Sequence, residues 1–128
     1  MSTTNSLQSV DKKIAQEMVN AYCKEASKDP NSFTKAVWFP AEQILALANI
    51  INDGKHNGLR IYFAQYTEAT VDGLPKDDIG RNTVLLVPTF SEGQTNALGL
   101  TAVESEDDTD NIENRGKKCP DMCEGVTL

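Results

Sequence analysis

The sequence predicts an α+β domain in which two amphipathic helices pack on a mainly antiparallel sheet of three to four strands. Three observations predict it: an N-terminal stretch with apolar residues at helical spacing, a second such stretch after Pro40, and two apolar runs at 59–66 and 83–89. A chain of 128 residues is of ordinary size for one domain. We expect this domain to cover residues 1–103, followed by an acidic, flexible C-terminal extension at 104–128.

The first predicted helix lies between Leu7 and Ala26, where apolar residues recur every three or four positions. Because this is the period of one helix face, we expect the apolar stripe to pack on the sheet. Ser9 is the predicted N-cap, and Asp29-Pro30 is the predicted stop. The stripe consists of Leu7, Val10, Ile14, Met18, Tyr22 and Ala26.

The second predicted helix begins after Pro40, whose fixed φ suits the first turn of a helix. A short extended segment at 36–39 comes before it. The helix runs to Ile51, and Asp53-Gly54 ends it because glycine can adopt the left-handed conformation.

The run at 59–66 reads as a strand whose side chains alternate between two faces. We expect one face to be core and the other to be amphipathic. The core face carries Leu59, Ile61 and Phe63, and the amphipathic face carries Arg60, Tyr62 and Tyr66.

The run at 83–89 is apolar on both faces, which predicts a strand inside the sheet. The connection at 67–82 is long for a hairpin and is predicted to be a mobile surface loop. A weaker fourth strand is expected at Ala97–Val103, where Gly99 interrupts the pattern.

The formal net charge of −7 disfavours nucleic acid as a partner, because an acidic chain repels phosphate backbones. Acidic residues concentrate in 67–80 and 104–128. The latter segment has few apolar residues with which to offset its ordering entropy, hence the expected flexibility.

The first six residues are polar and uncharged, and no apolar run is long enough for a signal-peptide core or a membrane span. We therefore expect a cytoplasmic protein with no membrane partner. The odd number of cysteines, three, agrees with this expectation because secreted disulfide frameworks use even numbers.

The cysteines leave two interpretations open. Cys119 and Cys123 could share a soft metal ion, and Cys23 with His56 would complete a Cys₃His set if the fold brought them close. In the favoured interpretation the thiols are reduced, and the chain has no metal site and no cofactor. A redox pair is less favoured, because three residues separate the cysteines where the thioredoxin motif has two.

His56 is the single histidine, so any hydrolase or transferase chemistry would have this one imidazole base. It lies in a glycine-rich turn, which favours a solvated side chain. The acidic run at 107–113 lacks the glycine and the complete ligand pattern of a calcium loop. We therefore predict no catalytic residues and lean against an enzyme.

The predicted binding surface is the amphipathic strand face, because tyrosines and arginine are effective interface anchors. The alternative is that covering helices bury these side chains as core. The predicted function is a non-enzymatic interaction or binding module whose partner is another protein or a second copy. A thiol or metal-binding protein using the cysteine pair is the alternative. The predicted partner-binding residues are Arg60, Tyr62, Tyr66 and Trp38.

Four segments resemble those of uncharacterised small bacterial single-domain proteins. They are Val37-Trp38-Phe39, Gly58–Phe63, Val84–Thr89 and Cys119-Pro120-Asp121-Met122-Cys123. The resemblance implies that the strands and the terminal cysteine pair belong to one pattern, and it implies no activity. Ala64, often glycine in such proteins, and the acidic Asp121 depart from that pattern.

Overall fold

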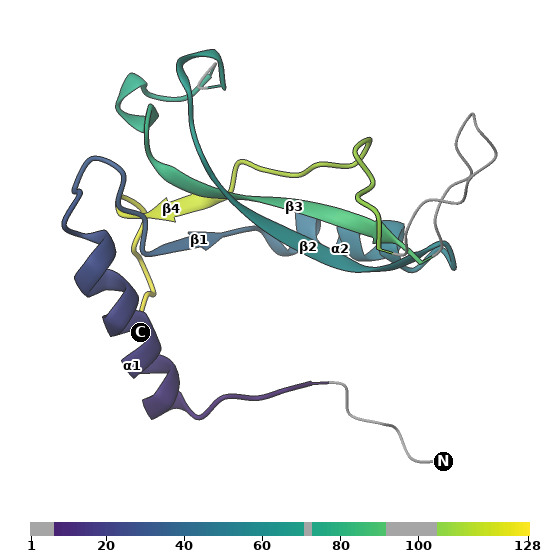
Figure 1. Ribbon diagram of the computed structural model, residues 1–128, viewed down its shortest axis with the longest axis horizontal. Helices are drawn as coiled ribbons and strands as arrows, with labels where there is room; N and C mark the ends of the chain where they lie inside the picture. The colour runs from purple at the N-terminus through teal and green to yellow at the C-terminus, as the bar shows by residue number, and fades with distance from the viewer. Residues whose placement is uncertain (1–6, 71–72, 92–104) are drawn as a thin grey trace.

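The computed structural model describes residues 7–70, 73–91 and 105–128, and within them the α+β class is confirmed (Figure 1). Two antiparallel sheets of two strands each, β1–β4 and β2–β3, are present where the sequence predicted one sheet of three to four strands. The strand expected at 97–103 lies outside the described residues. In chain order the helices and strands are α1 (Lys12–Ala26), β1 (Ala36–Trp38), α2 (Ala41–Ile51), β2 (His56–Gln65), β3 (Asn82–Phe90) and β4 (Lys117–Cys119).

The β2–β3 hairpin is the centre of the fold, with Ile61 of β2 opposite Leu86 of β3. The middle of β3 is fully enclosed, since Val87 is 2% exposed and Pro88 is more deeply buried still. β3 has β2 on one edge and residues 105–113 on the other, which satisfies its backbone on both sides. The connection between the two strands contains the 3₁₀ turns Glu68–Thr70 and Lys76–Asp78.

Residues 105–128, which we call the C-terminal segment, lie against the rest of the chain instead of forming the predicted flexible extension. Leu86 and Glu113 exchange two backbone hydrogen bonds of 2.9 Å, and the amide of Asp108 donates to the carbonyl of Pro88 at 2.8 Å. Further along, β4 pairs with β1. Composition misled the prediction because the segment is held by polar and backbone bonds, with little apolar burial of its own.

α2 follows the prediction closely. Pro40 is its N-cap, Asn52 its C-cap, and Gly54 beyond it has a φ of +80°, in the left-handed region that glycine enters without strain. Leu47 is the fully buried residue of this helix, at 3% exposure. Through this face α2 packs against one end of the β2–β3 hairpin.

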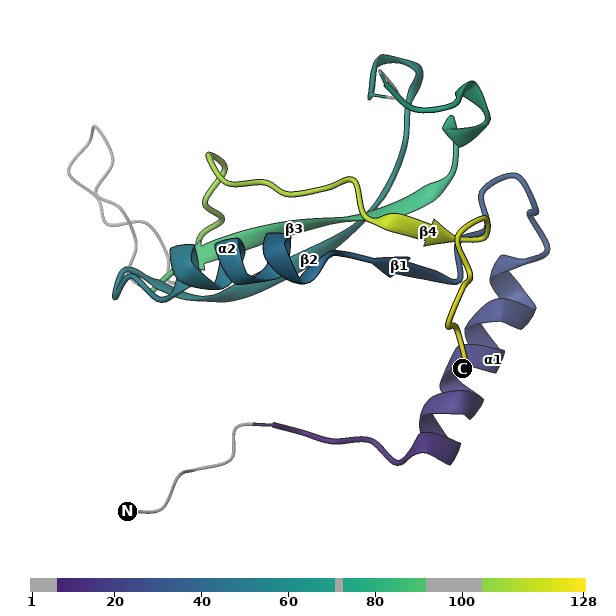
Figure 2. The same ribbon diagram turned by 180° about the vertical axis from the view of Figure 1, so that it is seen from behind.

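α1 differs from the prediction at its start and on its apolar face. Asp11, and not Ser9, caps it, with Oδ2 accepting from the Lys13 amide at 3.0 Å. The expected packing of the stripe on the sheet is wrong, because Ile14 is 53% and Met18 60% exposed. α1 projects from the end of the molecule where β1 and β4 pair, as both ribbon views show (Figures 1 and 2).

No helix in the described ranges is both long and apolar enough to cross a bilayer.

Candidate functional site

Arg60 and Tyr62, two of the predicted partner-binding residues, are brought together by Asp107 of the same chain. The Arg60 guanidinium donates to Oδ1 of Asp107 at 2.5 Å and to the Ser105 carbonyl at 3.0 Å. The Tyr62 hydroxyl donates to the other oxygen of the Asp107 carboxylate. The amphipathic face of β2 therefore holds the C-terminal segment.

The Asp107 cluster also shifts the protonation of its members in the directions that a shared carboxylate requires. Its hydrogen bond to Tyr62 raises the pKa of the phenol above 10.0. The same bond, with help from Arg60, lowers the pKa of Asp107 below 3.8. Both shifts favour one state at neutral pH, an ionised Asp107 bound by a neutral phenol.

Tyr66 lies further along the same face and is only 4% exposed. Its hydroxyl donates to Oδ1 of Asn114 at 2.9 Å, and Lys118 lies 5.0 Å from its ring. Trp38, in contrast, is 55% exposed and has Lys117 at 5.1 Å. Because Lys117 and Lys118 are neighbours on β4, their side chains leave opposite faces, so Trp38 is not brought to the Tyr66 side.

The His56 side chain is 6% exposed, and both of its ring nitrogens are bonded. Nε2 lies 2.8 Å from Asp108 Oδ2 and Nδ1 lies 2.9 Å from Asp53 Oδ2, while the ring stacks on Phe90 at 4.9 Å. The bonds to Asp108 and Asp53 raise the pKa of His56 above 6.5, against the opposing effect of burial. The solvated turn histidine expected from sequence is thus a bridge between two carboxylates.

Asp108 is nearly inaccessible, at 5% exposure. Burial raises the pKa of this carboxyl, but hydrogen bonds from His56 and Asn111 outweigh burial and lower it below 3.8. The cluster is therefore an ion pair with satisfied partners, and it joins the turn before β2 to the C-terminal segment.

Cys119 and Cys123 form a disulfide, and Cys23 on α1 is the free cysteine. The sulfurs of Cys119 and Cys123 are thus bonded to each other, and the structure does not bring Cys23 or His56 to this pair. Within the described ranges no three histidine, cysteine or acidic side chains are grouped as metal ligands.

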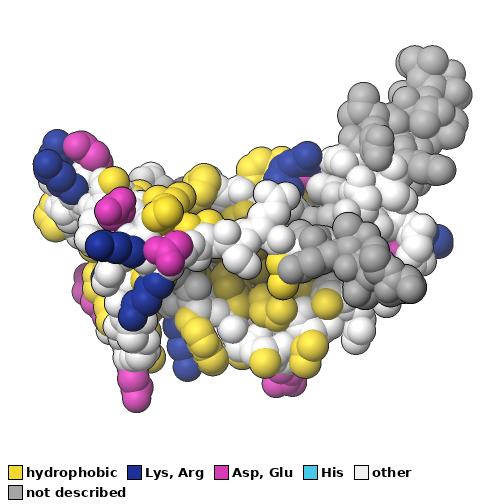
Figure 3. Space-filling view, turned by 90° about the horizontal axis from the view of Figure 1, so that it is seen from below, with side chains coloured by type: hydrophobic (Ala, Val, Ile, Leu, Met, Phe, Trp, Pro, Cys, Tyr) yellow, Lys and Arg dark blue, Asp and Glu magenta, His cyan; other side chains and the backbone are white. Residues whose placement is uncertain are grey.

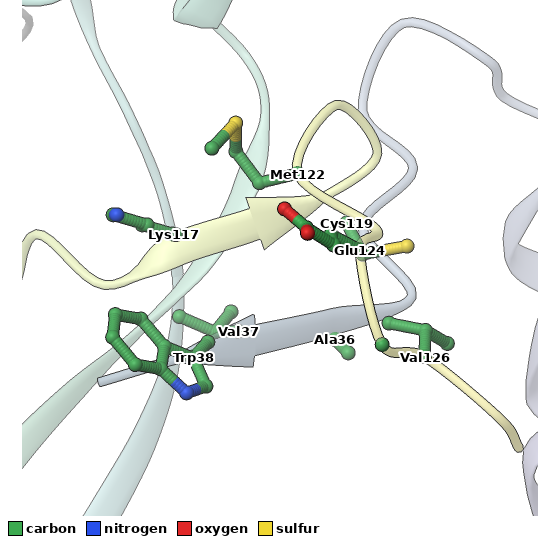
Figure 4. A pocket seen from close by; sticks show the side chains of 9 residues that line it. Ala36, Val37, Trp38, Lys117, Cys119, Met122, Glu124 and Val126 are labelled. Atoms are coloured by element: carbon green, nitrogen blue, oxygen red, sulfur yellow. The ribbon is translucent and has the colours of Figure 1, made fainter. Parts of the chain in front are cut away.

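A cavity of about 490 Å³ adjoins the disulfide. Figure 4 shows Trp38 and Val37 at one end of β1, Val126 beside Ala36 at the other end, and Met122 above β4. Cys119 is part of the cavity lining and is buried, at 4% exposure.

A groove of about 530 Å³ lies on the opposite face of the β2–β3 hairpin from the C-terminal segment. β2 contributes the side chains that the sequence assigned to the core, and these are open: Leu59 is 40%, Ile61 52% and Phe63 91% exposed. Hydrophobic side chains gather below the sheet, around a hollow (Figure 3). The lining also includes Tyr22, Val37, Phe39, Ile44, Val84 and Leu86. We call this the apolar groove.

The sequence predicts correctly which residues of β2 share a face. It assigns the core to the face that is open in the structure, and the binding surface to the face that the C-terminal segment occupies. Alternation places Leu59, Ile61 and Phe63 together, yet it cannot say which segment covers them. One signal was available: once α2 packs on one end of the hairpin, α1 is the one other α-helix of the described residues that could cover the rest of this face.

Comparisons of the chain with protein-family models, with curated proteins and with solved structures found no match.

Proposed function

We propose that the protein is a non-enzymatic interaction module that binds an amphipathic helix of a protein partner in the apolar groove. The observation that carries this proposal is Phe63, a large aromatic side chain 91% exposed at the open end of an apolar concavity. Large apolar patches on a folded surface mark interaction sites, because leaving them in water is unfavourable.

The shape of the groove favours a helix over an extended peptide. It is lined by side chains from the sheet face, from Ile44 of α2 and from Phe39. A concave apolar floor with walls on two sides accepts the i, i+3, i+4 and i+7 side chains of an amphipathic helix.

The polar clusters support a non-enzymatic role. Both nitrogens of His56 are bonded to carboxylates, and Arg60 and Tyr62 are bonded to Asp107. These groups stabilise the C-terminal segment, so their chemistry has a structural use.

The test is binding of a fluorescent alanine-based helical peptide with leucines at three- and four-residue spacing, followed by anisotropy. We expect a micromolar dissociation constant, weakened at least about tenfold by Phe63→Asp. The matched control is Ile79→Asp, which changes an exposed apolar residue (42%) outside the groove lining. Equal binding of a peptide with the same composition in scrambled order, or no effect of Phe63→Asp, would refute the proposal.

The disulfide favours a second candidate, a thiol–disulfide role for Cys119 and Cys123. Cytosolic reductants keep thiols reduced, so in the expected cytoplasmic location this pair would be a dithiol that oxidises reversibly. Oxidation would pass two electrons and two protons to glutathione disulfide, which becomes two glutathione thiols. Equilibration in glutathione buffers decides it: a potential above about −230 mV supports exchange, and one below about −300 mV identifies a structural disulfide.

A further inference from the structure

Among the apolar surfaces exposed on the described part of the chain are two that lie on different elements. One is the apolar groove. The other, which we call the α1 stripe, is the face of α1 that carries Ile14, Met18 and Tyr22, with Val10 just before the helix. Val10, Ile14 and Met18 are each more than half exposed. A lone surface leucine needs no explanation, but two extended apolar faces on one small chain do.

The two surfaces match in length. Ile14 to Tyr22 covers about 12 Å along the helix axis at the usual rise per residue. Leu59 to Phe63 covers about 13 Å along β2 at the rise of a strand. Two turns of α1 therefore fit the open floor of the groove.

The helix and the chain as a whole carry opposite net charges. α1 contains three lysines and two glutamates, so the helix is net positive, whereas the whole chain carries −7. Two copies of net charge −7 repel each other at long range, so the positive charge of this helix favours the contact only at close range.

α1 is held in a position from which Ile14 and Met18 do not line the groove of its own chain, whereas Tyr22 does. The Tyr22 hydroxyl donates to the Thr34 carbonyl at 2.8 Å, and the Tyr22 ring stacks on Phe33 at 6.3 Å. Tyr22 thus forms one end of the groove. From there the helix leads away from the hairpin (Figure 1).

We propose that the occupant of the groove is α1 of a second copy, in a two-fold dimer in which each copy lays its α1 stripe on Leu59, Ile61 and Phe63 of the other. The inference rests on the proposed function of the groove as a helix-binding site. This arrangement has closed two-fold symmetry, because the groove and the α1 stripe of both copies are covered at once. With on the order of 100 Å² per exposed side chain, twelve such side chains bury about 1,200 Å², the lower bound for a specific interface.

The first test is the molar mass of the full chain by sedimentation over a range of concentrations. The dimer is expected for the natural sequence, and both Met18→Asp and Phe63→Asp should weaken dimerisation at least about tenfold. Both side chains are largely exposed, so neither change removes a buried core group. Asn20→Asp, on the opposite face of α1, is the matched control and should remain dimeric.

The second test is pairwise mixing. Met18→Asp keeps an intact groove and Phe63→Asp an intact helix, so a mixture should form a heterodimer with one good contact, although each variant alone is monomeric. In a Cys23→Ser background, Met18→Cys mixed with Phe63→Cys should give a crosslinked dimer. Failure of both mixtures would overturn the proposal, as would a crosslink formed within one chain of the double variant.

The outcomes separate this inference from the function on which it rests. A chain that is monomeric at all concentrations but binds the helical peptide in the groove overturns the dimer and leaves the interaction module standing. A monomeric chain that also ignores the peptide overturns both.

Discussion

His56 Nε2 lies 2.8 Å from Asp108 Oδ2, joining the start of β2 to a residue 52 positions later in the chain. Both side chains are 6% exposed, so the bond is sheltered from water and salt. Together with the bond from Nδ1 to Asp53, it stabilises the imidazolium form of the ring.

The stability of the protein should therefore fall as the pH rises above 6.5. The folded-state pKa of His56 is raised above its unfolded value of 6.5, so its contribution is complete below 6.5 and is lost as the pH passes through the raised pKa. Chemical denaturation at a series of pH values measures this slope.

His56→Gln is the control, because His56 is the single histidine. The variant should lack the slope and should be less stable at pH 6 by about 1.5–3 kcal/mol, the usual value of hydrogen bonds to a charged group. A wild-type stability that rises through this pH range would contradict the assignment.

On the acid side the carboxylates act in the opposite direction. The pKa values of Asp53 and Asp108 are lowered below 3.8, so their contributions are present above 3.8 and are lost as the pH falls through the lowered values. We expect acid unfolding to begin below pH 3.8. In Asp108→Asn, the stability should depend less steeply on pH in this range. Acid titration followed by circular dichroism measures the midpoint, and an unchanged profile for Asp108→Asn would count against the cluster.

Tyr62 should titrate above 10.0 because its hydroxyl donates to the Asp107 carboxylate, a bond that deprotonation breaks. Asp107→Asn removes the negative charge and should bring the pKa of Tyr62 back toward 10.0. Site-resolved NMR of the labelled Tyr62 ring measures both values. If the two proteins titrate alike, Asp107 does not hold the phenol.

The fold class, both helices and the positions of β1, β2 and β3 could be predicted because they depend on local spacing, whereas β4 lies in the segment predicted to be flexible. Pro40 and Gly54 set the limits of α2, and alternation sorted Arg60 and Tyr62 from their neighbours. The covering segments could not be predicted in this way. Asp107 and Asn114 occupy the amphipathic face through pairings across more than 40 residues, and neither periodicity nor composition encodes such contacts.

The same limit explains the candidate site. The Leu59, Ile61 and Phe63 face has the pattern of a core strand whether a helix of its own chain, a second copy or nothing covers it. The disulfide could not be predicted from spacing alone either. Cys119 and Cys123 are close enough in sequence to pair, but their pairing depends on how the loop between them is held.

Gly116 should not tolerate a side chain. It is buried, and a Cβ built there would lie against Val37 Cγ1 and 2.9 Å from Phe39 Cζ, inside the contact between β1 and β4. Gly116→Ala should cost about 1–3 kcal/mol through overpacking. Gly58→Ala is the matched control, since its Cβ would meet Thr89 Oγ1 at an ordinary 3.7 Å. Equal unfolding free energies for the two variants would show that the chain near Gly116 moves aside.

Reduction of the Cys119–Cys123 disulfide should destabilise the protein by about 2 kcal/mol, as closing a short loop restricts the unfolded chain. The loop is also anchored in the folded state, because Arg81 donates to the Pro120 carbonyl and Lys118 pairs with the buried Asp78 at 3.1 Å.

Because these contacts hold the disulfide loop to the rest of the chain, we expect reduction to loosen part of the molecule and not to unfold all of it. With the crosslink gone, the β1–β4 pair should open more often, whereas the β2–β3 hairpin keeps its own ladder. Hydrogen exchange with and without reductant should therefore lose protection first at Val37 and Lys118. Cys23→Ser, which leaves the disulfide intact, should behave like the natural sequence. Uniform loss of protection along β3 instead would mean that the two sheets unfold as one cooperative unit.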